Sequence, residues 1–154
     1  MDFIFEVFPN TRTALKKIIE NSSLTTLNEI PAGFNNNIIW NIGHIVVTEQ
    51  LLVYKLSGMQ PMVSDVLIER YKKDSKPDGK ASQEEVDEIK NLLLTTIERT
   101  TKDYNNKAFK TYNEYTVSTT GNTLKNVNDA LNFALLHEGM HVGYILALKR
   151  ALKK

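Results

Sequence analysis

The sequence predicts an all-α protein, and two observations support this fold class. Seven glycines and four prolines among 154 residues are about 7% of the chain, against about 12% in average proteins. Such a shortage of turn-forming residues favours a few long helices over many short strands. Apolar residues also recur at helical spacing in four segments. Four such helices in a short chain predict a four-helix bundle of the up-and-down type with a longer crossover, forming a single domain over residues 1–154.

Composition and charge exclude several classes of protein. Hydrophobic residues make up 42% and charged residues 24% of the chain, as in an ordinary soluble domain. The net charge of +1 gives no footprint for a polyanion, so we expect no nucleic-acid partner. No uncharged apolar stretch is long enough to span a membrane, and the acidic N-terminus does not resemble a signal peptide. We therefore expect a cytoplasmic protein with no membrane partner. Cysteine is absent, which excludes disulfides, thiolate metal sites and cysteine nucleophiles.

The first half of the chain predicts two long helices. The first covers residues 9–20, and a short extra turn follows at 24–30. The second covers 38–56, with candidate N-caps at 35–37. A short helix is indicated near 66–68, before a charged loop. The second helix has an apolar seam at steps of four and three residues, which predicts that it faces other helices: Trp40, His44, Val47, Leu51 and Tyr54.

The second half predicts two further long helices. A capping box at 82–85 begins the third, which extends to about Tyr104. Residues 109–120 are rich in Tyr and Thr and predict either an extended crossover or a hairpin-like loop. Thr123 is a candidate cap for the fourth helix, over 124–151. The seam of this helix, with His137 flanking it, consists of Val127, Leu131, Ala134, Glu138, His141, Ile145 and Leu148.

The three histidines of the chain all fall on inward faces of predicted helices. His137 and His141 are four residues apart, so their rings lie about 6 Å apart along one helix face. Imidazoles at this spacing can bind one metal ion at about 2.0–2.1 Å. His44 lies in an apolar seam, where a polar ring needs a partner. The alternative is a set of hydrogen-bonded core histidines; the joint pattern favours a three-histidine metal site, which leaves coordination positions open for chemistry.

A competing motif overlaps this site. His137, Glu138 and His141 match H-E-x-x-H, the zinc metalloprotease helix in which the glutamate is the general base. The longer metzincin form requires Gly and His where this chain has Tyr144 and Ala147. No glutamate follows His141 to serve as a third ligand. A protease is therefore the less favoured alternative.

Four residues near the predicted ligands are candidates for supporting roles. Glu138 lies within reach of the histidine face and is a candidate base or orienting residue; the alternative is an ordinary carboxylate beside the seam. Asn41 and Tyr144 are each one turn from a predicted ligand and could orient rings or line a pocket, although plain packing explains both. Trp40 is either a core residue or one wall of the pocket.

Two motifs resemble the DinB-like superfamily: Trp40-Asn41-Ile42-Gly43-His44, and His137-x-x-x-His141-Val142-Gly143. The run PAGF-NNNIIWN that leads into the first motif adds to the likeness, which covers nearly the whole chain. This resemblance implies a four-helix bundle, often a homodimer, in which His44, His137 and His141 bind a divalent ion, usually zinc or nickel. It also implies low-molecular-weight thiol transferases, such as bacillithiol S-transferase and mycothiol-dependent maleylpyruvate isomerase.

The chain departs from the pattern of this superfamily in two places. Met140 stands where many relatives have a second histidine. Val142-Gly143-Tyr144 stands where relatives often carry Arg-Gly-Gln. These departures affect the expected substrate more than the fold or the ligands.

Three hypotheses for function follow. The first is a metal-dependent enzyme acting on a small molecule, either a hydrolase or a thiol S-transferase with a low-molecular-weight thiol cosubstrate. The ion would lower the pKa of water towards about 7 or deprotonate a thiol outright. The second is a non-catalytic metal-binding module. The third is a dimerising scaffold whose histidines are core residues.

Overall fold

The structure, a computed structural model, describes residues 2–153 and consists mainly of helices. This confirms the predicted all-α class. The long helices are α1 (Asp2–Glu20), α3 (Ile38–Gln50), α5 (Gln83–Asn105) and α6 (Val127–Leu152). The smaller elements are α2 (Leu24–Asn28), the π-helix η1 (Leu51–Lys55), α4 (Asp65–Tyr71), and the strands β1 (Tyr115–Thr116) and β2 (Thr123–Leu124). Within the described residues, no helix combines the length and apolarity of a membrane span.

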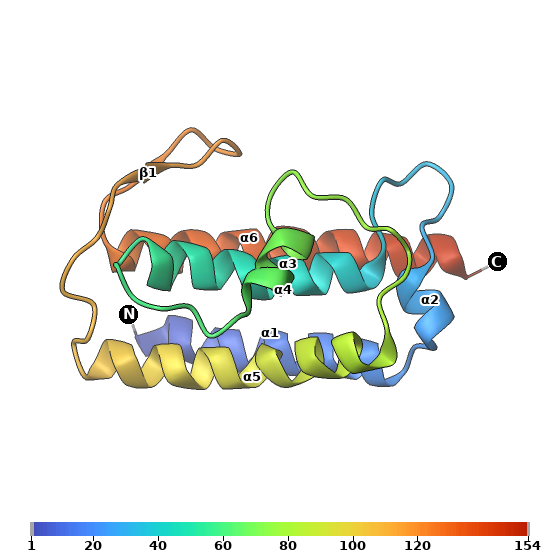
Figure 1. Ribbon diagram of the computed structural model, residues 1–154, viewed down its shortest axis with the longest axis horizontal. Coiled ribbons are helices and arrows are strands. Elements are labelled where there is room, and N and C mark those ends of the chain that lie inside the picture. Colours follow the sequence, from blue (N-terminus) through green and yellow to red (C-terminus); the bar gives the residue numbers. More distant parts are fainter. Residues whose placement is uncertain (1, 154) are drawn as a thin grey trace.

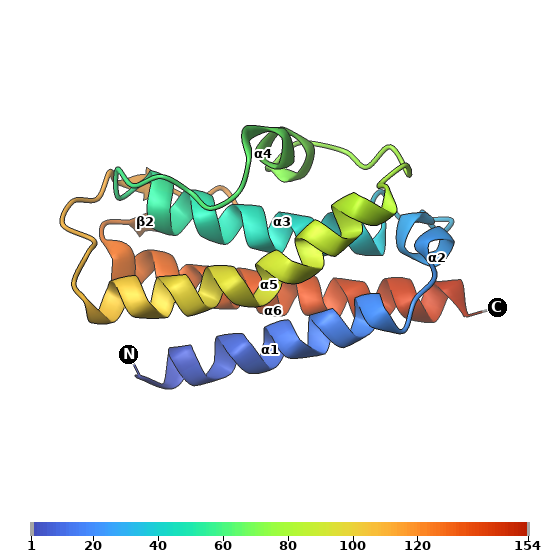
Figure 2. The same cartoon turned by 60° about the horizontal axis from the view of Figure 1, so that its bottom comes forward.

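The four long helices form a bundle in which α1 and α3 lie on a diagonal. Helix α1 packs against α5 and α6, and α3 packs against the same two helices. The ribbon shows α1 and α6 running in one direction and α3 and α5 in the other (Figures 1 and 2). The parallel course of α3 and α5 requires a long connection, which is residues 56–82 and contains α4. The sequence predicts a longer crossover and indicates 109–120 as a candidate segment for it, whereas the structure has the crossover at 56–82. Because α3 and α5 are parallel, the order departs from a strict up-and-down bundle.

Side-chain caps set where several helices begin. Ser82 Oγ accepts a hydrogen bond from the Glu85 N–H, as the predicted capping box requires. Asn126 Oδ1 accepts from the first N–H groups of α6. The predicted cap at Thr123 is wrong: Thr123 lies in β2, and its hydroxyl is hydrogen-bonded to that of Thr116. Asn126 can accept from two N–H groups at once, so the helix begins at residue 127 rather than 124.

Helix α1 begins at Asp2, well before the predicted start at residue 9. Pro9 lies inside the helix and removes one backbone hydrogen bond, at a typical cost of about 3 kcal/mol. The preceding turns bury Ile4 and Phe8, which are 5% and 0% exposed. Burial of two such side chains contributes about 3–6 kcal/mol. This gain offsets the cost of the proline, and the helix continues through it.

The segment after α5 is a hairpin, one of the two predicted alternatives. β1 and β2 pair antiparallel, with Tyr115 opposite Leu124. Gly121 takes a positive φ of 75° in the connecting turn, a conformation that glycine adopts at little cost. Val117 and Leu124 are each 3% exposed, and they attach the hairpin to the bundle near the start of α6 (Figure 1).

The core of the bundle is divided along its length by a polar layer. One apolar cluster includes Leu15 and Ile145, and the other includes Phe8 and Ala134. Between these clusters, all four long helices contribute buried polar side chains: Arg12, His44, Glu49, Gln50, Thr96, Thr100, His137 and Glu138. Buried polar groups cost free energy unless they are paired, so this layer is where a functional site is expected.

Candidate metal centre

The three histidines predicted as metal ligands meet at one point of the polar layer. His44 comes from α3, and His137 and His141 come from α6; one nitrogen from each ring lies within 4.8 Å of the other two. The Nε2 atoms of His137 and His141 are 3.1 Å apart. Two nitrogen ligands at about 2.1 Å from one ion, at angles of about 95–110°, are separated by about 3.1–3.4 Å. The spacing of this pair therefore fits a shared ion.

Hydrogen bonds fix the tautomers of two rings. His44 Nδ1 lies 2.6 Å from the carbonyl oxygen of Tyr71, an acceptor only, so Nδ1 carries the proton and donates. His141 Nδ1 lies 2.8 Å from Asn41 Oδ1. The Nδ2 of Asn41 donates to the Asn37 carbonyl, so Oδ1 is the atom that accepts from His141. In both rings the lone pair is left on Nε2, the atom that faces the other histidines, as in most protein metal sites.

Burial keeps all three rings neutral. It lowers the pKa of His137 to about 3, with further lowering from the neighbouring histidines and Arg12. Burial and His44 lower the pKa of His141 to about 4. Burial also lowers the pKa of His44, although the hydrogen bond to Tyr71 partly opposes this. Neutral imidazole is the form that binds metals. The donor set therefore fits a divalent ion in protonation state as well as in spacing.

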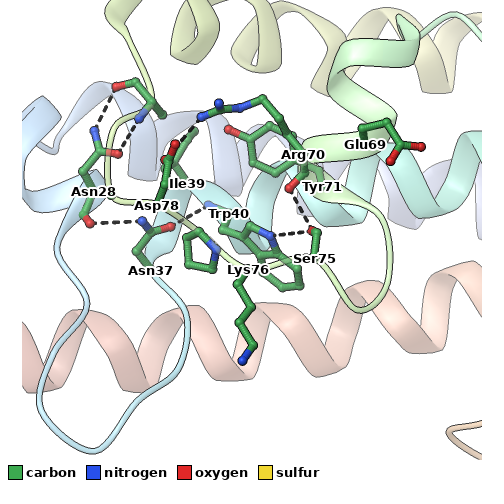
Figure 3. A pocket seen from close by; sticks show the side chains of 13 residues that line it. Asn28, Asn37, Ile39, Trp40, Glu69, Arg70, Tyr71, Ser75, Lys76 and Asp78 are labelled. Carbon is green, nitrogen blue, oxygen red and sulfur yellow. Dashed lines mark hydrogen bonds and ion pairs between the residues drawn. The ribbon is translucent and has the colours of Figure 1, made fainter.

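The ring of His44 is held by Trp40 of its own helix and by groups from the crossover. Trp40 stacks on it, with ring centroids 4.7 Å apart and planes at 10°. The indole Nε1 donates to Ser75 Oγ, which ties Trp40 to the segment after α4 (Figure 3). The Tyr71 ring packs against Gly43 so closely that an added Cβ would lie 2.4 Å from Tyr71 Cδ1. Glycine at position 43 thus lets α4 approach α3 and place the Tyr71 carbonyl at the ligand.

A small cavity of about 180 Å³ is lined by Trp40 and by residues of the crossover, and none of the three histidines lines it (Figure 3). The polar side chains around it bond mainly to the protein. Asn28 bonds to the backbone of Ala81, and Asn37 Nδ2 donates to the Asn28 carbonyl. These bonds hold the crossover against the start of α3. We assign this region the role of supporting Trp40 and His44.

A larger cavity of about 370 Å³ opens from the three histidines. It lies between α3, η1, α6 and the hairpin, and the surface exposed inside it is mostly apolar. Thr48 adds a hydroxyl, whose Oγ1 lies 3.4 Å from His44 Nε2. None of the described residues that line it is Asp or Glu. Because this cavity reaches the free nitrogens, a small molecule there could contact an ion held by the histidines.

Glu138 does not face this cavity, so the prediction that it is a base or an orienting residue for the metal site is corrected. It is 1% exposed and accepts a hydrogen bond from Arg12 Nε at 2.6 Å through Oε2. Its other oxygen accepts from Thr11 Oγ1. Successive helical residues differ by about 100° in direction, so Glu138 faces α1 while His137 faces α3. The arrangement of the H-E-x-x-H proteases is therefore absent from these described residues.

The other three predicted supporting residues differ in whether they contact the histidines by a hydrogen bond or ring stacking. Asn41 and Trp40 do, and Tyr144 does not. Asn41 accepts a hydrogen bond from a predicted ligand, although that ligand is His141 on the opposite helix and not His44 on its own. Trp40 stacks on His44 and lines the small cavity, not the one that opens from the histidines. Tyr144 packs against Phe34, with centroids 5.6 Å apart, and lines neither cavity. The contact from Tyr144 is therefore packing.

Sequence reasoning missed three contributors to the site. The Tyr71 carbonyl is a backbone group, which no residue pattern identifies. Arg12, fully buried, looks like a surface residue of α1 in sequence. Thr48 gave no signal beyond its position one turn after His44. Gly43, inside an otherwise apolar helix, was the one available sign that another element approaches closely.

The helical bundle and its three-histidine centre define the class of this protein. The family model of the DinB superfamily matches residues 8–145, and the chain belongs to that superfamily. Among solved structures, it is similar to a conserved protein from Enterococcus faecalis, with a TM-score of 0.67 and 14% sequence identity. That match covers 98% of this chain and 95% of the other, and at this identity it shows the fold alone. No curated protein matches the chain.

Proposed function

We propose that this protein is a metal-dependent enzyme that joins a low-molecular-weight thiol, through its sulfur, to a small electrophilic molecule. His44, His137 and His141 would hold the ion. Zinc and nickel are the metals proposed, because both bind imidazole well. The observation that carries the proposal is the chemical character of the cavity, in which three neutral imidazoles adjoin apolar side chains and no lining carboxylate.

The absence of a carboxylate from the described lining favours a thiol over water as the nucleophile. When bound, a divalent ion would deprotonate a thiol outright, whereas water would keep a pKa near about 7 and benefit from a base. The protein's own part is to fix the ligands and limit water. Asn41 and the Tyr71 carbonyl accept from Nδ1–H of His141 and His44, which leaves the lone pair of each ring on Nε2. Leu51, Leu52 and Phe133 line the cavity with apolar surface.

Hydrolysis is the second candidate, and one observation favours it. The hydroxyl of Thr48 lies beside His44 Nε2, where it can hold a water by hydrogen bonding. Since no described residue that lines the cavity carries a carboxylate, a hydrolase would have to use this hydroxyl, or solvent, to accept the proton of the attacking water.

The test begins with metal content. Protein purified without a histidine tag is incubated with zinc or nickel, and elemental analysis should give about one equivalent per chain. Turnover of chlorodinitrobenzene with a panel of biological thiols is then measured before and after chelation. We expect thiol-dependent turnover that is lost on chelation and restored by the metal. Turnover that survives complete removal of the metal would contradict the proposal, and chelator-sensitive cleavage of nitrophenyl esters without thiol would favour the hydrolase.

The homodimer expected from the family resemblance stays a prediction. Light scattering of the purified protein measures its mass directly.

A further inference from the structure

The large cavity carries positive charge that the metal centre does not explain. Lys55, in η1, and Lys73, just after α4, both line this cavity. The remaining lining is largely apolar: Leu51, Leu52, Leu56, Val117, Phe133 and Met140. Any bound ion would add to the positive charge, and a cavity of one sign concentrates ligands of the opposite sign.

The position of Lys55 along the helix sets the geometry of a ligand. His44, Thr48 and Lys55 all line the cavity, so they share one face of the continuous helix formed by α3 and η1. Eleven residues separate His44 from Lys55, which corresponds to about 16 Å along the axis. Leu51 and Leu52, which also line the cavity, lie between these two polar ends along the helix. Lys73 follows Tyr71, whose carbonyl contacts His44, so this second lysine is nearer to the metal end.

Neither lysine is neutralised by a close carboxylate. Among the side chains that the structure describes, in residues 3–153, no carboxylate lies within ion-pair distance of Lys55. Lys73 Nζ lies 3.9 Å from Asp74 Oδ2, but these side chains are 58% and 85% exposed, and such pairs contribute little. Asp74 does not line the cavity. Both ammonium groups are therefore available to a ligand.

We propose that the substrate that fills this cavity is an amphipathic anion: a reacting group at the histidine end, an apolar body, and a carboxylate or phosphate bound by Lys55, with Lys73 adding attraction. The reacting end rests on the proposed function, whereas the anion site stands on the cavity and its lysines. In this assignment Lys55 determines specificity, because it contacts the distal charge and not the reacting atoms. A charge-assisted contact at an apolar surface is stronger than one in water.

The test compares three thiols of equal length that differ only in their far end: mercaptohexanoate, mercaptohexanol and mercaptohexylamine. The protein is incubated with Co²⁺, and thiol binding is followed by the sulfur-to-cobalt charge-transfer band. We expect mercaptohexanoate to bind about tenfold more tightly than mercaptohexanol, and the amine to bind most weakly. Lys55→Met should remove most of this preference, and Lys73→Met a smaller part. Lys102→Met, an exposed position on α5, is the matched control and should keep it.

A second measurement does not use the metal. Anilinonaphthalene sulfonate, an apolar anion that fluoresces in apolar cavities, is titrated into the metal-free protein and the same variants. We expect weaker binding to the Lys55→Met variant, with circular dichroism confirming that it is folded. If binding of the dye depends on Lys55 but no thiol gives the sulfur-to-cobalt band, the anion site is supported and the proposed thiol chemistry is overturned. Equal affinity for all three thiols, or a preference unchanged in Lys55→Met, would overturn the anion site and leave the metal chemistry standing.

Discussion

His137 and Glu138 are neighbours in sequence, but their environments in the polar layer differ in kind. Glu138 is fully enclosed and paired with Arg12 at 2.6 Å. His137 has its Nε2 directed at a second imidazole, and it lines a cavity large enough for a ligand. One half of the layer thus closes on itself, whereas the other leaves lone pairs available. The comparison shows that two residues of one motif can separate into structural and functional roles when a helix directs them to different partners.

The largest expected effect is on metal affinity, and it comes from removing one of the three histidines that face the cavity. His137→Ala takes one of the three donors from the centre, and a two-histidine site loses the convergence that would hold the ion. We expect the metal affinity to fall by more than the ten- to hundredfold typical of losing an outer partner. Competition with a coloured chelator measures this fall. Full metal content in the folded variant would show that the ion is bound elsewhere.

Substitutions in the buried Arg12–Glu138 pair should lower the stability of the fold and leave metal affinity unchanged. Arg12→Met leaves Glu138 buried without its cation, which typically costs about 3–5 kcal/mol in the free energy of unfolding. Adding Glu138→Leu removes the unpaired carboxylate, so the double variant should regain much of the loss. Urea denaturation measures both values. Metal affinity should be unchanged in the double variant, because neither residue contacts the histidines through a hydrogen bond. A large loss of metal affinity in the double variant would show that Glu138 supports the metal site after all.

A smaller effect is expected from the residue that orients His141. Asn41→Ala removes the acceptor for Nδ1–H and frees the ring to rotate. The expected loss in metal affinity is about ten- to hundredfold, measured by the same competition. Asn132→Ala, at an exposed position of α6, is the control and should bind as the parent does. If the two variants bind metal alike, the hydrogen bond from His141 to Asn41 has no orienting role.

The sequence was sufficient to predict the helices and the histidine cluster, because both depend on periodicity. Spacing of three and four residues predicts a shared face, and the inward faces of two helices must meet in a bundle. The direction of the Glu138 side chain, toward α1, was not predictable in the same way. Its position in the predicted seam is compatible with packing against either α1 or α3, and the choice depends on Arg12, which is distant in sequence.

The supporting contacts were harder to predict because they come from elements without a periodic signal. The Tyr71 carbonyl reaches His44 from a short helix in the crossover, and Lys73 lies in the loop that follows. Asn41 was expected to support the site from its own helix, but its partner is on α6. These contacts depend on how the crossover and the helices pack, which spacing along one segment does not encode.

The last prediction concerns Glu49, a second buried carboxylate near Arg12. Burial raises the pKa of Glu49 above its ordinary value, and this outweighs the opposing effects of Arg12 and of hydrogen bonds from Gln50 and Thr100. The folded state therefore holds this proton more tightly than the unfolded state. The resulting stability is present at low pH and is lost as the pH rises through the folded-state pKa.

Glu49→Gln removes this titration and keeps both contacts, since an amide can accept from Gln50 and donate to the Thr100 hydroxyl. We expect the melting temperature of the variant, relative to the parent, to increase from pH 5 to pH 8. Thermal denaturation of the metal-free proteins at both values measures the change. Glu88→Gln, at an exposed position of α5, controls for the altered net charge. A difference that stays constant with pH would mean that Glu49 keeps its charge in the core, and that Arg12 stabilises two carboxylates rather than one.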